Sequence, residues 1–516
     1  MNGVTASYRR YSGIAGPKNH PTLHCRKCAN TARAVEALAA PHTPRGDVER
    51  AVESAMVLYS AKIAFGERDP RRFHILPPAA LAGTSDANEE QLRSAYLHLE
   101  AAHRAPCELG KTPLILHRMT VLGIANDLNY IVKAFAIANY RPGGHEGQLL
   151  LLPPAPPPPQ GRSAGNNRKS LVEGRRIDNA WHWLDGLPGA KLDSIFTPSA
   201  CQLRLQRPDE IGRLRALDAA SRNGSFSGAA QALGLGEHAF DAASAIQAIG
   251  KGLTFAYVPA QFRQHGMLWW FQALTTYLLR VRGPLAALLQ RHPAMQALAG
   301  RLAVGGSGST VLQREWLASS EAALRSAVRR DGSQEVGWLP SATFDAALHV
   351  RMGDACGPRA KRNQGIVRKC VPTLRAGLAP LLAHGVVPRG GRLFLATDSQ
   401  SIVDEAAAAA ATLPFEVYYL NISREKYDSE AWIELNSAKD RTKGSILEET
   451  MLDLLLLSRA RYIAGSMYGN MPRVALQLRP TAPGDARRLA WVTTDGRDWC
   501  TKPTCMTNNT PTGRYW

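Results

Sequence analysis

Residues 346–354 combine an apolar run with side chains that can bind a phosphorylated ligand. His349 and Arg351 alternate with apolar residues, so both polar side chains can point to one side of a strand. Because ligands of α/β domains collect at the carboxyl ends of strands, a fixed cation there can hold a phosphorylated ligand. Arg351 offers bidentate hydrogen bonds to a diphosphate, and Gly353 lets the backbone come close. The alternative interpretation is a basic strand end that pairs with a neighbouring Asp.

The segments after this run alternate between strands and helices, and further polar residues fall at strand ends. Thr397 and Asp398 end one expected strand, and Ser466 opens the loop after another. Such alternation predicts a parallel, doubly wound sheet. Ser399 is expected to cap the helix that follows Asp398. The expected strands are 392–396, 415–420, 462–465 and 489–493, and the expected helices are 367–383, 401–412, 446–458 and 471–478.

A second strand–helix–strand unit is expected in the first half of the chain. Apolar strands at 113–116 and 148–152 flank a helix at 130–139. Gly123 allows a tight turn that exposes helix N–H groups. The Pro-rich and then Ser-, Gly- and Asn-rich residues 153–170 predict a flexible surface insertion.

Two further segments have features of binding sites, but the simpler interpretation is structural. The helix expected at 267–281 carries an aromatic face, including Trp270 and Tyr277, which favours core packing over a platform for sugars. The Gly- and Ser-rich segment 305–310 lacks the following Lys and the preceding strand of a phosphate-binding loop. It is therefore interpreted as a linker between two halves.

Composition and charge narrow the class of protein. The 516 residues allow two or three domains, and 45% hydrophobic with 20% charged residues is typical of a soluble globular protein. Lys and Arg (62) exceed Asp and Glu (43), and the formal charge of +19 is compatible with nucleic acid, an anionic membrane or a phosphorylated substrate. Because the basic residues are scattered and no nucleic-acid-binding module is recognisable, we do not expect nucleic acid as a partner.

Targeting signals are not visible in the sequence. No apolar run approaches the ~20 residues needed to cross a bilayer, so no membrane anchor is recognised. The first residues lack the layout of a signal peptide, which leaves a cytosolic protein or a chain without its first segment. The Cys25-x-x-Cys28 pattern has no second ligand pair nearby, which argues against zinc.

Four other cysteines bear on the compartment. They form two pairs whose spacings suit local disulfides, with free thiols as the alternative. If the disulfides form, the expected location is the Golgi or endoplasmic reticulum lumen. Asn223 and Asn421 would then be N-glycosylation acceptors. The pairs are Cys356 with Cys370 and Cys500 with Cys505.

Several segments together resemble the GDP-fucose-dependent fucosyltransferases of the α1,6/O-fucosyl superfamily, nearest to the core α1,6-fucosyltransferases. Residues 349–354 are similar to that family's H-x-R-x-x-D loop, and 395–398 to its A-T-D strand end. Residues 452–475 look like its L-D-x-x-x-L-S, G-S and R-V-A run. Residues 266–279 resemble the helix before its phosphate-binding loop, and 123–128 resemble its opening glycine loop.

This likeness spans about residues 113–494. It implies a GT-B-like α/β enzyme with two Rossmann-like halves that face a cleft. The expected parts are a weakly structured N-terminal extension at 1–90, an acceptor-side domain at 91–335, a nucleotide-sugar-binding domain at 336–500 and a tail at 501–516.

The resemblance also implies site residues and partners. His349 and Asp453 would hold the guanine nucleoside, Arg351 the diphosphate and Ser466 a phosphate oxygen. The donor would be GDP-fucose and the acceptor a glycan or glycoprotein, with no metal or other cofactor. Without a metal, an Arg and helix N–H groups must stabilise the charge of the leaving diphosphate. The remaining expected site residues are Gly123, Asn126, Gly353, Asp354, Thr397 and Asp398.

The general base is the least defined part of this hypothesis. Inverting glycosyl transfer usually needs a base, and the family has acidic residues after its H-x-R-x-x-D loop. Residues 355–362 here contain no carboxylate, which leaves Asp354, Asp398 and Asp127. We expect Asp354 to act with Arg351 as the catalytic pair.

The expected function is metal-independent, inverting transfer of fucose from GDP-fucose. The first alternative is a catalytically inactive protein of the same fold that binds nucleotide sugars or glycans, favoured by the missing carboxylates. The second is a nucleic-acid-binding protein, favoured only by the net charge of +19.

Overall fold

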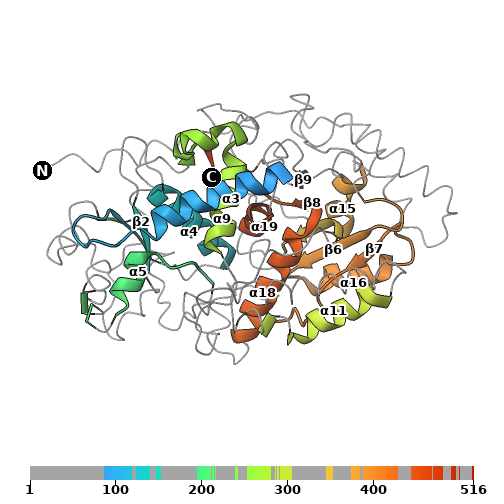
Figure 1. Ribbon diagram of the computed structural model, residues 1–516. Coiled ribbons are helices and arrows are strands. Elements are labelled where there is room, and N and C mark those ends of the chain that lie inside the picture. Colours follow the sequence, from blue (N-terminus) through green and yellow to red (C-terminus); the bar gives the residue numbers. More distant parts are fainter. Residues whose placement is uncertain are drawn as a thin grey trace, which may run out of the picture. The chain divides into compact units, whose positions relative to one another are not determined.

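The computed structural model describes a large part of the second half of the chain and shorter stretches of the first (Figure 1). All described residues belong to one compact unit, Arg68–Trp516, and the other unit, Met1–Glu67, lies outside them. The predicted extension 1–90 is described only from Asp86, where helix α3 (Asp86–His103) begins. The described residues are 86–118, 124–139, 147–152, 195–207, 209–210, 212–213, 216, 239–241, 253–279, 285, 288–289, 291–304, 344–352, 373–383, 387–427, 443–467, 469–479, 490–494, 499 and 514–515.

Five parallel strands form the sheet in the second half of the chain. Their spatial order is β7-β6-β5-β8-β9, so the first strand in sequence, β5, is central and the order reverses between β5 and β8. The prediction of an α/β fold with a parallel sheet is confirmed, and the order is compatible with a Rossmann-like arrangement. The strands are β5 (Phe344–Val350), β6 (Arg392–Thr397), β7 (Glu416–Tyr418), β8 (Ala460–Gly465) and β9 (Ala490–Thr493).

Helices cover both faces of this sheet. Ala346, Leu348 and Val350 of β5 pack in one core cluster with α15 and α16, whereas Ala347 and Phe394 belong to the cluster that contains α18 and α19. Because both faces are covered, the strands are nearly continuous apolar runs. The helices are α15 (Leu374–Ala383), α16 (Gln400–Ala409), α18 (Lys443–Ser458) and α19 (Asn470–Leu478).

Most predicted elements of this half are confirmed to within a few residues, but the predicted cap is wrong. Ser399 occupies the N-cap position of α16, yet its side chain makes no capping hydrogen bond. Its Oγ instead lies 2.8 Å from Oγ of Ser401. The neighbouring hydroxyl therefore competes with the backbone N–H groups for the Ser399 side chain.

The first half contains a smaller parallel sheet in the order β2-β1-β3. Its strands are β1 (Leu114–Arg118), β2 (Gln148–Leu152) and β3 (Ala239–Asp241), and helix α4 (Ile124–Asn139) connects the first two. The predicted strand–helix–strand unit is confirmed. The helix starts six residues earlier than predicted, so Asn126 lies within α4 rather than in the preceding turn, and Gly123 lies outside the described residues.

Helix α9 (Met267–Leu278) is almost entirely buried. Trp269, Trp270 and Tyr277 each have 0% exposure, which confirms the core interpretation of its aromatic face. Phe262 stacks on Trp270, and Phe135 of α4 stacks on Tyr277. The aromatic side chains therefore join α9 to α4 and to the segment before it.

Several shorter elements complete the described structure. The predicted tail contributes β10, which pairs antiparallel with β4. None of the described helices combines the length and apolar character needed to cross a membrane. The elements are α5 (Ala200–Leu205), β4 (Leu253–Thr254), η6 (Phe255–Tyr257), η7 (Ala260–His265), α11 (Pro293–Val304) and β10 (Arg514–Tyr515).

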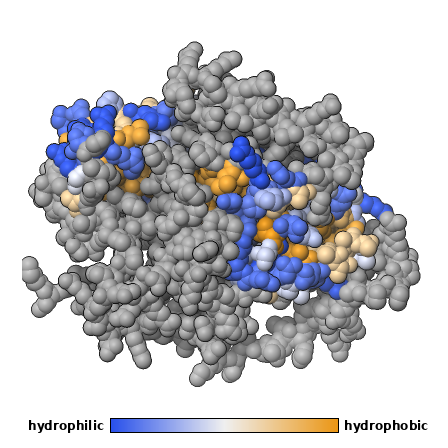
Figure 2. Space-filling model, turned by 90° about the horizontal axis from the view of Figure 1, so that it is seen from below, coloured by the Kyte–Doolittle hydropathy of each residue, from blue (hydrophilic) through white to orange (hydrophobic). Residues whose placement is uncertain are grey.

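The coloured part of the face in Figure 2 is mainly hydrophilic. Figure 2 shows blue side chains over most of the coloured part of one face, with small apolar groups between them. Among the described large apolar side chains, Leu97, Leu203 and Leu288 are the exposed ones, and they belong to three separate segments. Single exposed leucines of this kind are ordinary in soluble domains.

Candidate functional site

The strand order places the candidate site at the carboxyl ends of β5 and β8. In open parallel sheets, ligands bind where the strand order reverses, because the loops leave in opposite directions there. His349 of β5 is the register partner of Gly465 at the end of β8. Arg351 lies two residues after His349, and Ser466 follows Gly465 directly, so three of the predicted site residues lie at this position.

Gly465 permits a close approach between β8 and the start of α19. A Cβ atom at this position would lie 2.7 Å from Cγ of Pro472 and 3.3 Å from Cβ of His349. Any side chain would push α19 away from the end of the sheet. The loop between β8 and α19 is therefore held tightly beside His349.

His349 is a buried, neutral imidazole. Its side chain is 8% exposed, and burial together with the positive charge of Arg351 lowers its pKa to about 3. Its Nδ1 atom is shielded from solvent and has no hydrogen-bond partner among the described residues. A buried polar nitrogen of this kind is costly unless it is satisfied, for example by a ligand.

Arg351 is exposed just beyond β5. Its predicted contact with a diphosphate stays a prediction. Gly353 and Asp354, the next two predicted residues, lie outside the described part of the chain, as does Gly123. The catalytic role expected for Asp354 is therefore untested.

Thr397 and Asp398 have structural contacts at the adjacent strand end. Oδ1 of Asp398 accepts a 2.7 Å hydrogen bond from N–H of Met352. Thr397 is 4% exposed, and its Oγ1 accepts from N–H of Ser399 at 3.2 Å. Asp398 thus ties the loop after β5 to the end of β6, while the Thr397 hydroxyl is used within its own turn.

Asp453 lies on α18 and is half-buried, with its Oδ1 atom shielded from solvent. That oxygen has no hydrogen-bond partner among the described residues. Burial raises the pKa of Asp453 to about 8, and the negative charges of Glu449 and Asp398 add to the effect, while Arg424 opposes it. At neutral pH the side chain is therefore mainly protonated, and it must lose a proton before it can serve as a carboxylate acceptor.

Arg424 is a buried cation that the sequence analysis missed. It is 1% exposed and donates to three backbone carbonyls, those of Thr397 (3.0 Å), Leu420 (2.9 Å) and Ile422 (3.0 Å). These bonds fasten the loop after β7 to the end of β6. In the sequence, Arg424 is one of several charged residues in a loop, and no pattern distinguishes it from a solvated side chain.

The same loop is also attached to α18. Lys426 Nζ lies 2.6 Å from Oε1 of Glu449, and the Tyr427 hydroxyl donates to Oε2 of Glu449 at 2.7 Å. Glu449 is one turn before Asp453 on the same helix. The loop after β7 is therefore held against α18 one turn from the half-buried Asp453.

Asn126 is hydrogen-bonded to α19, a helix that packs on the five-stranded sheet. Its Oδ1 accepts a 2.8 Å hydrogen bond from Nδ2 of Asn470, the first residue of α19. Oδ1 of Asn470 in turn accepts from Nδ2 of Asn129 at 3.1 Å. Asn129 and Asn470 were not predicted, because their partners are more than 300 residues apart in sequence.

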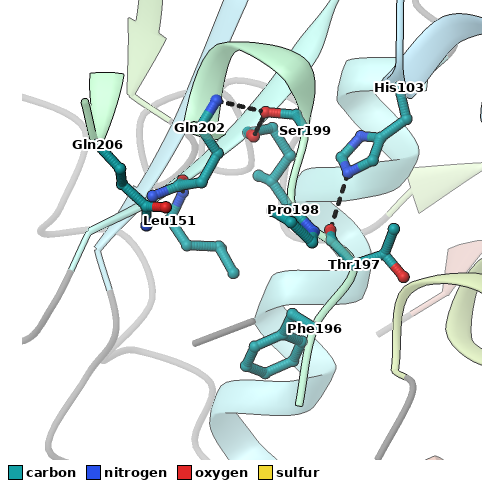
Figure 3. Close-up of a pocket in the computed structure, with 9 residues that line it drawn as sticks. His103, Leu151, Phe196, Thr197, Pro198, Ser199, Gln202 and Gln206 are labelled. Atoms are coloured by element: carbon teal, nitrogen blue, oxygen red, sulfur yellow. Dashed lines mark hydrogen bonds between the residues drawn. The ribbon is translucent and has the colours of Figure 1, made fainter. Parts of the chain in front are cut away.

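A small hollow elsewhere in the structure is not part of this site. It lies beside β2 and α5, with His103, Phe196 and Leu151 among its lining side chains (Figure 3). It has room for about one water molecule. His103 Nε2 donates to the carbonyl of Thr197 at 2.9 Å, so this nitrogen is engaged within the protein.

Comparison with models of known protein families finds no match. Comparison with curated proteins finds no match either. The site therefore has to be interpreted from its own residues. Within the described ranges no three His, Cys, Asp or Glu side chains gather as a set that could hold a metal ion, and metal independence stays a prediction.

Proposed function

We propose that this protein is a glycosyltransferase that transfers fucose from GDP-fucose to a glycan or glycoprotein acceptor. The observation that carries the proposal is the meeting of His349, Arg351 and Ser466 at the strand-order reversal of a parallel sheet. The finer proposal is a GT-B-like arrangement, with the two parallel sheets forming the donor and acceptor sides.

The charges at this position suit a nucleoside diphosphate. Arg351 supplies a cation, and Gly469, the N-cap residue of α19, leaves the first-turn N–H groups of that helix without a side-chain cap. A departing diphosphate gains negative charge, and both groups stabilise that charge without a metal. His349 is neutral, so it can bind a nucleoside by hydrogen bonding and does not add a second charge.

The acceptor hydroxyl must lose a proton during inverting transfer. Asp354 remains our proposed base, because Oδ1 of Asp398 is engaged with the backbone of Met352. The acceptor side of the site would be formed by the start of α4, where Asn126 lies.

The proposed location is the Golgi or endoplasmic reticulum lumen. The supporting observation is a disulfide between Cys107 and Cys201, whose Cα atoms are 4.9 Å apart. Structural disulfides persist mainly in oxidising compartments. The two local pairs predicted from sequence, Cys356–Cys370 and Cys500–Cys505, lie outside the described residues.

A second candidate function is nucleotide-sugar or glycan binding without catalysis. It is favoured by the use of Thr397 and Asp398 in structural contacts and by the lack of a carboxylate in residues 355–362. This protein would bind GDP-fucose but release no GDP when acceptors are added.

The test is titration of GDP, UDP and GDP-fucose into the full chain by calorimetry in the presence of EDTA, followed by an assay of GDP release with mixed glycan acceptors. We expect binding of GDP and GDP-fucose without metal, weaker binding of UDP, and acceptor-dependent GDP release. Equal binding of UDP, or binding only with Mn²⁺, would contradict the proposed donor. Binding without release would favour the second candidate.

A further inference from the structure

Helix α19 makes hydrogen bonds at both of its ends, with α4 at its start and with α9 at its C-terminal end. At its start, the side-chain amide of Asn470 is shared between Asn126 and Asn129, which lie one turn apart on α4. Asn470 donates to the first at 2.8 Å and accepts from the second at 3.1 Å. One amide therefore uses a donor and an acceptor on the same neighbouring helix.

At its other end, α19 is bonded to α9. Nε2 of Gln272 donates to the carbonyl of Leu476 at 2.9 Å, and Oγ1 of Thr275 donates to Oε1 of Gln477 at 3.2 Å. All four residues are buried. Figure 1 shows α19 between the helices α4 and α9 and helix α18.

Between these two ends, the contact of α19 with α4 includes a repulsion. Lys133 of α4 and Arg473 of α19 are 4% and 5% exposed. Burial and the positive charge of Arg473 lower the pKa of Lys133 to about 7. The charge of Arg473 therefore favours the neutral form of Lys133 at this contact between the two helices.

We propose that Asn470 is a positioning residue that couples the start of α4 to the loop between β8 and α19. That loop contains Ser466 and enters the candidate site, whereas the start of α4 belongs to the other sheet. A ligand that orders the loop would also order the start of α4 through the shared amide. The predicted effect of a ligand rests on the proposed function. The contact between Asn470 and α4 is present without a ligand and does not depend on that function.

The physical basis is the position of Asn470 at the N-terminus of α19. When an anion is held by the first-turn N–H groups of a helix, that turn loses freedom to fray. Asn470 is the first residue of this turn, and it is half-buried. The bonds at the other end of α19 are buried and two turns away, and they carry no such link.

Hydrogen exchange of the full chain tests the contact without any ligand. The relevant amides are those of residues 128–131, which close the first turn of α4. In Asn470→Ala we expect these amides to exchange about tenfold faster, because two hydrogen bonds that hold the turn are lost. Thr275→Val is the matched control, because it removes a hydroxyl that contacts Gln477 at the other end of α19 and Phe271 within α9, and it keeps the side-chain shape. Unchanged exchange in Asn470→Ala, or equal acceleration in Thr275→Val, would overturn the proposal.

Asn470→Asp separates positioning from a general structural role. An aspartate can still accept from Asn129, and a flip of the Asn126 amide would let it also accept from Nδ2 of Asn126, which has no partner among the described residues. Protection of α4 should therefore return in this variant. GDP affinity should fall at least threefold, because a negative charge now lies at the proposed anion site. Failure of Asn470→Asp to restore protection would contradict the shared-amide contact.

Addition of GDP tests the ligand coupling. In the wild type we expect GDP to slow exchange both in the loop before α19 and in the first turn of α4, and in Asn470→Ala only in the loop. GDP that binds and leaves α4 unaffected would overturn the coupling but not the proposed function. Absence of GDP binding would overturn the proposed function and the ligand coupling together, whereas the ligand-free comparison would still decide the contact.

Discussion

The outer side of edge strand β2 and the carboxyl ends of the central strands β5 and β8 differ in how their polar groups are hydrogen-bonded. At the outer edge of β2, Oγ of Ser199 donates to the carbonyl of Leu149, and N–H of Leu151 donates to Oε1 of Gln202. In the other sheet, Nδ1 of His349 near the carboxyl end of β5 and Oδ1 of Asp453 on α18 are buried and have no partner among the described residues.

The β2 edge is closed by the chain itself. Gln148 donates to the carbonyl of Ala105 and accepts from N–H of Cys201, and the Cys107–Cys201 disulfide joins the same two segments. The bonds of Ser199 and Gln202 occupy backbone groups of Leu149 and Leu151, which hinders pairing of β2 with another chain. Buried polar groups that stay unsatisfied cost free energy, so they are expected where a ligand completes them. The β2 edge is therefore structural, whereas binding at the carboxyl ends of β5 and β8 is our proposal.

The largest expected effect is on GDP affinity in Arg351→Ala, and it tests whether the carboxyl ends of β5 and β8 bind a ligand. If Arg351 holds a diphosphate, its removal should weaken GDP binding by about two to four orders of magnitude, or roughly 3–5 kcal/mol. The melting temperature should hardly change, because Arg351 is exposed beyond β5. Calorimetric titration of GDP measures the effect. Arg461→Ala is the control, because Arg461 is an exposed cation at the beginning of β8, at the opposite end of the sheet. Wild-type GDP affinity in Arg351→Ala would contradict the proposal that Arg351 holds the diphosphate.

The next effect concerns the structural edge. Replacement of Cys107 and Cys201 by Ser should lower the free energy of unfolding by about 4–5 kcal/mol, because the disulfide closes a loop of 94 residues. GDP affinity of the folded protein should stay unchanged. Thermal unfolding of the double variant, alone and with GDP, checks both statements. A loss of GDP affinity that equals the loss of stability would show that the β2 edge and the proposed binding site are not independent.

A smaller effect is expected from Ser199→Ala at the same edge. Ser199 is the N-cap residue of α5; it accepts from N–H of Gln202 at 3.0 Å and donates to Leu149. Its loss should destabilise the protein by about 1–2 kcal/mol, which denaturant unfolding can measure. Ser199→Thr, which retains the hydroxyl, should recover most of this loss. Full stability of Ser199→Ala would mean that the β2 edge is not held by this side chain.

The last effect is a change in the pH dependence of stability at the proposed binding site. Because the pKa of Asp453 is raised to about 8, the folded protein holds a proton that the unfolded chain releases above about pH 4. The wild type should therefore lose stability as the pH rises from about 4 to 8, and Asp453→Asn should lose less. Melting temperatures of both proteins across this range measure the difference. His349, whose pKa is lowered to about 3, contributes the opposite slope below about pH 6.5 in both proteins, so the difference between them isolates Asp453. Parallel curves would contradict the raised pKa.

The sequence predicted the regular elements and the residues at strand ends, because both follow from local patterns. The alternation of apolar strands with helices identified the parallel sheet, and the polar residues after β5 and β8 marked its proposed binding site. The helix start at Ile124 was missed because Asn126 and Asn129 have low helix propensity and resemble a turn.

Features that depend on distant contacts could not be predicted in this way. Cysteine spacing favoured local pairs, whereas the Cys107–Cys201 disulfide joins residues 94 positions apart. Arg424 gains its role only when the loop after β7 folds back on the carbonyl of Thr397. The shared amide of Asn470 likewise has no signal in the sequence, because its partners belong to another sheet.

The attachment of α19 to α4 also has a consequence for protein synthesis. Asn126 and Asn470 are 344 residues apart, and roughly 20–70 s separate their synthesis at typical elongation rates. During that time, the sides of α4 and α9 that later contact α19 have no partner. Long-range closure of this kind slows folding and exposes apolar surface, including parts of the tryptophan-bearing helix. A molecular chaperone would therefore be needed most during synthesis, after the first half of the chain is complete and before α19 is made.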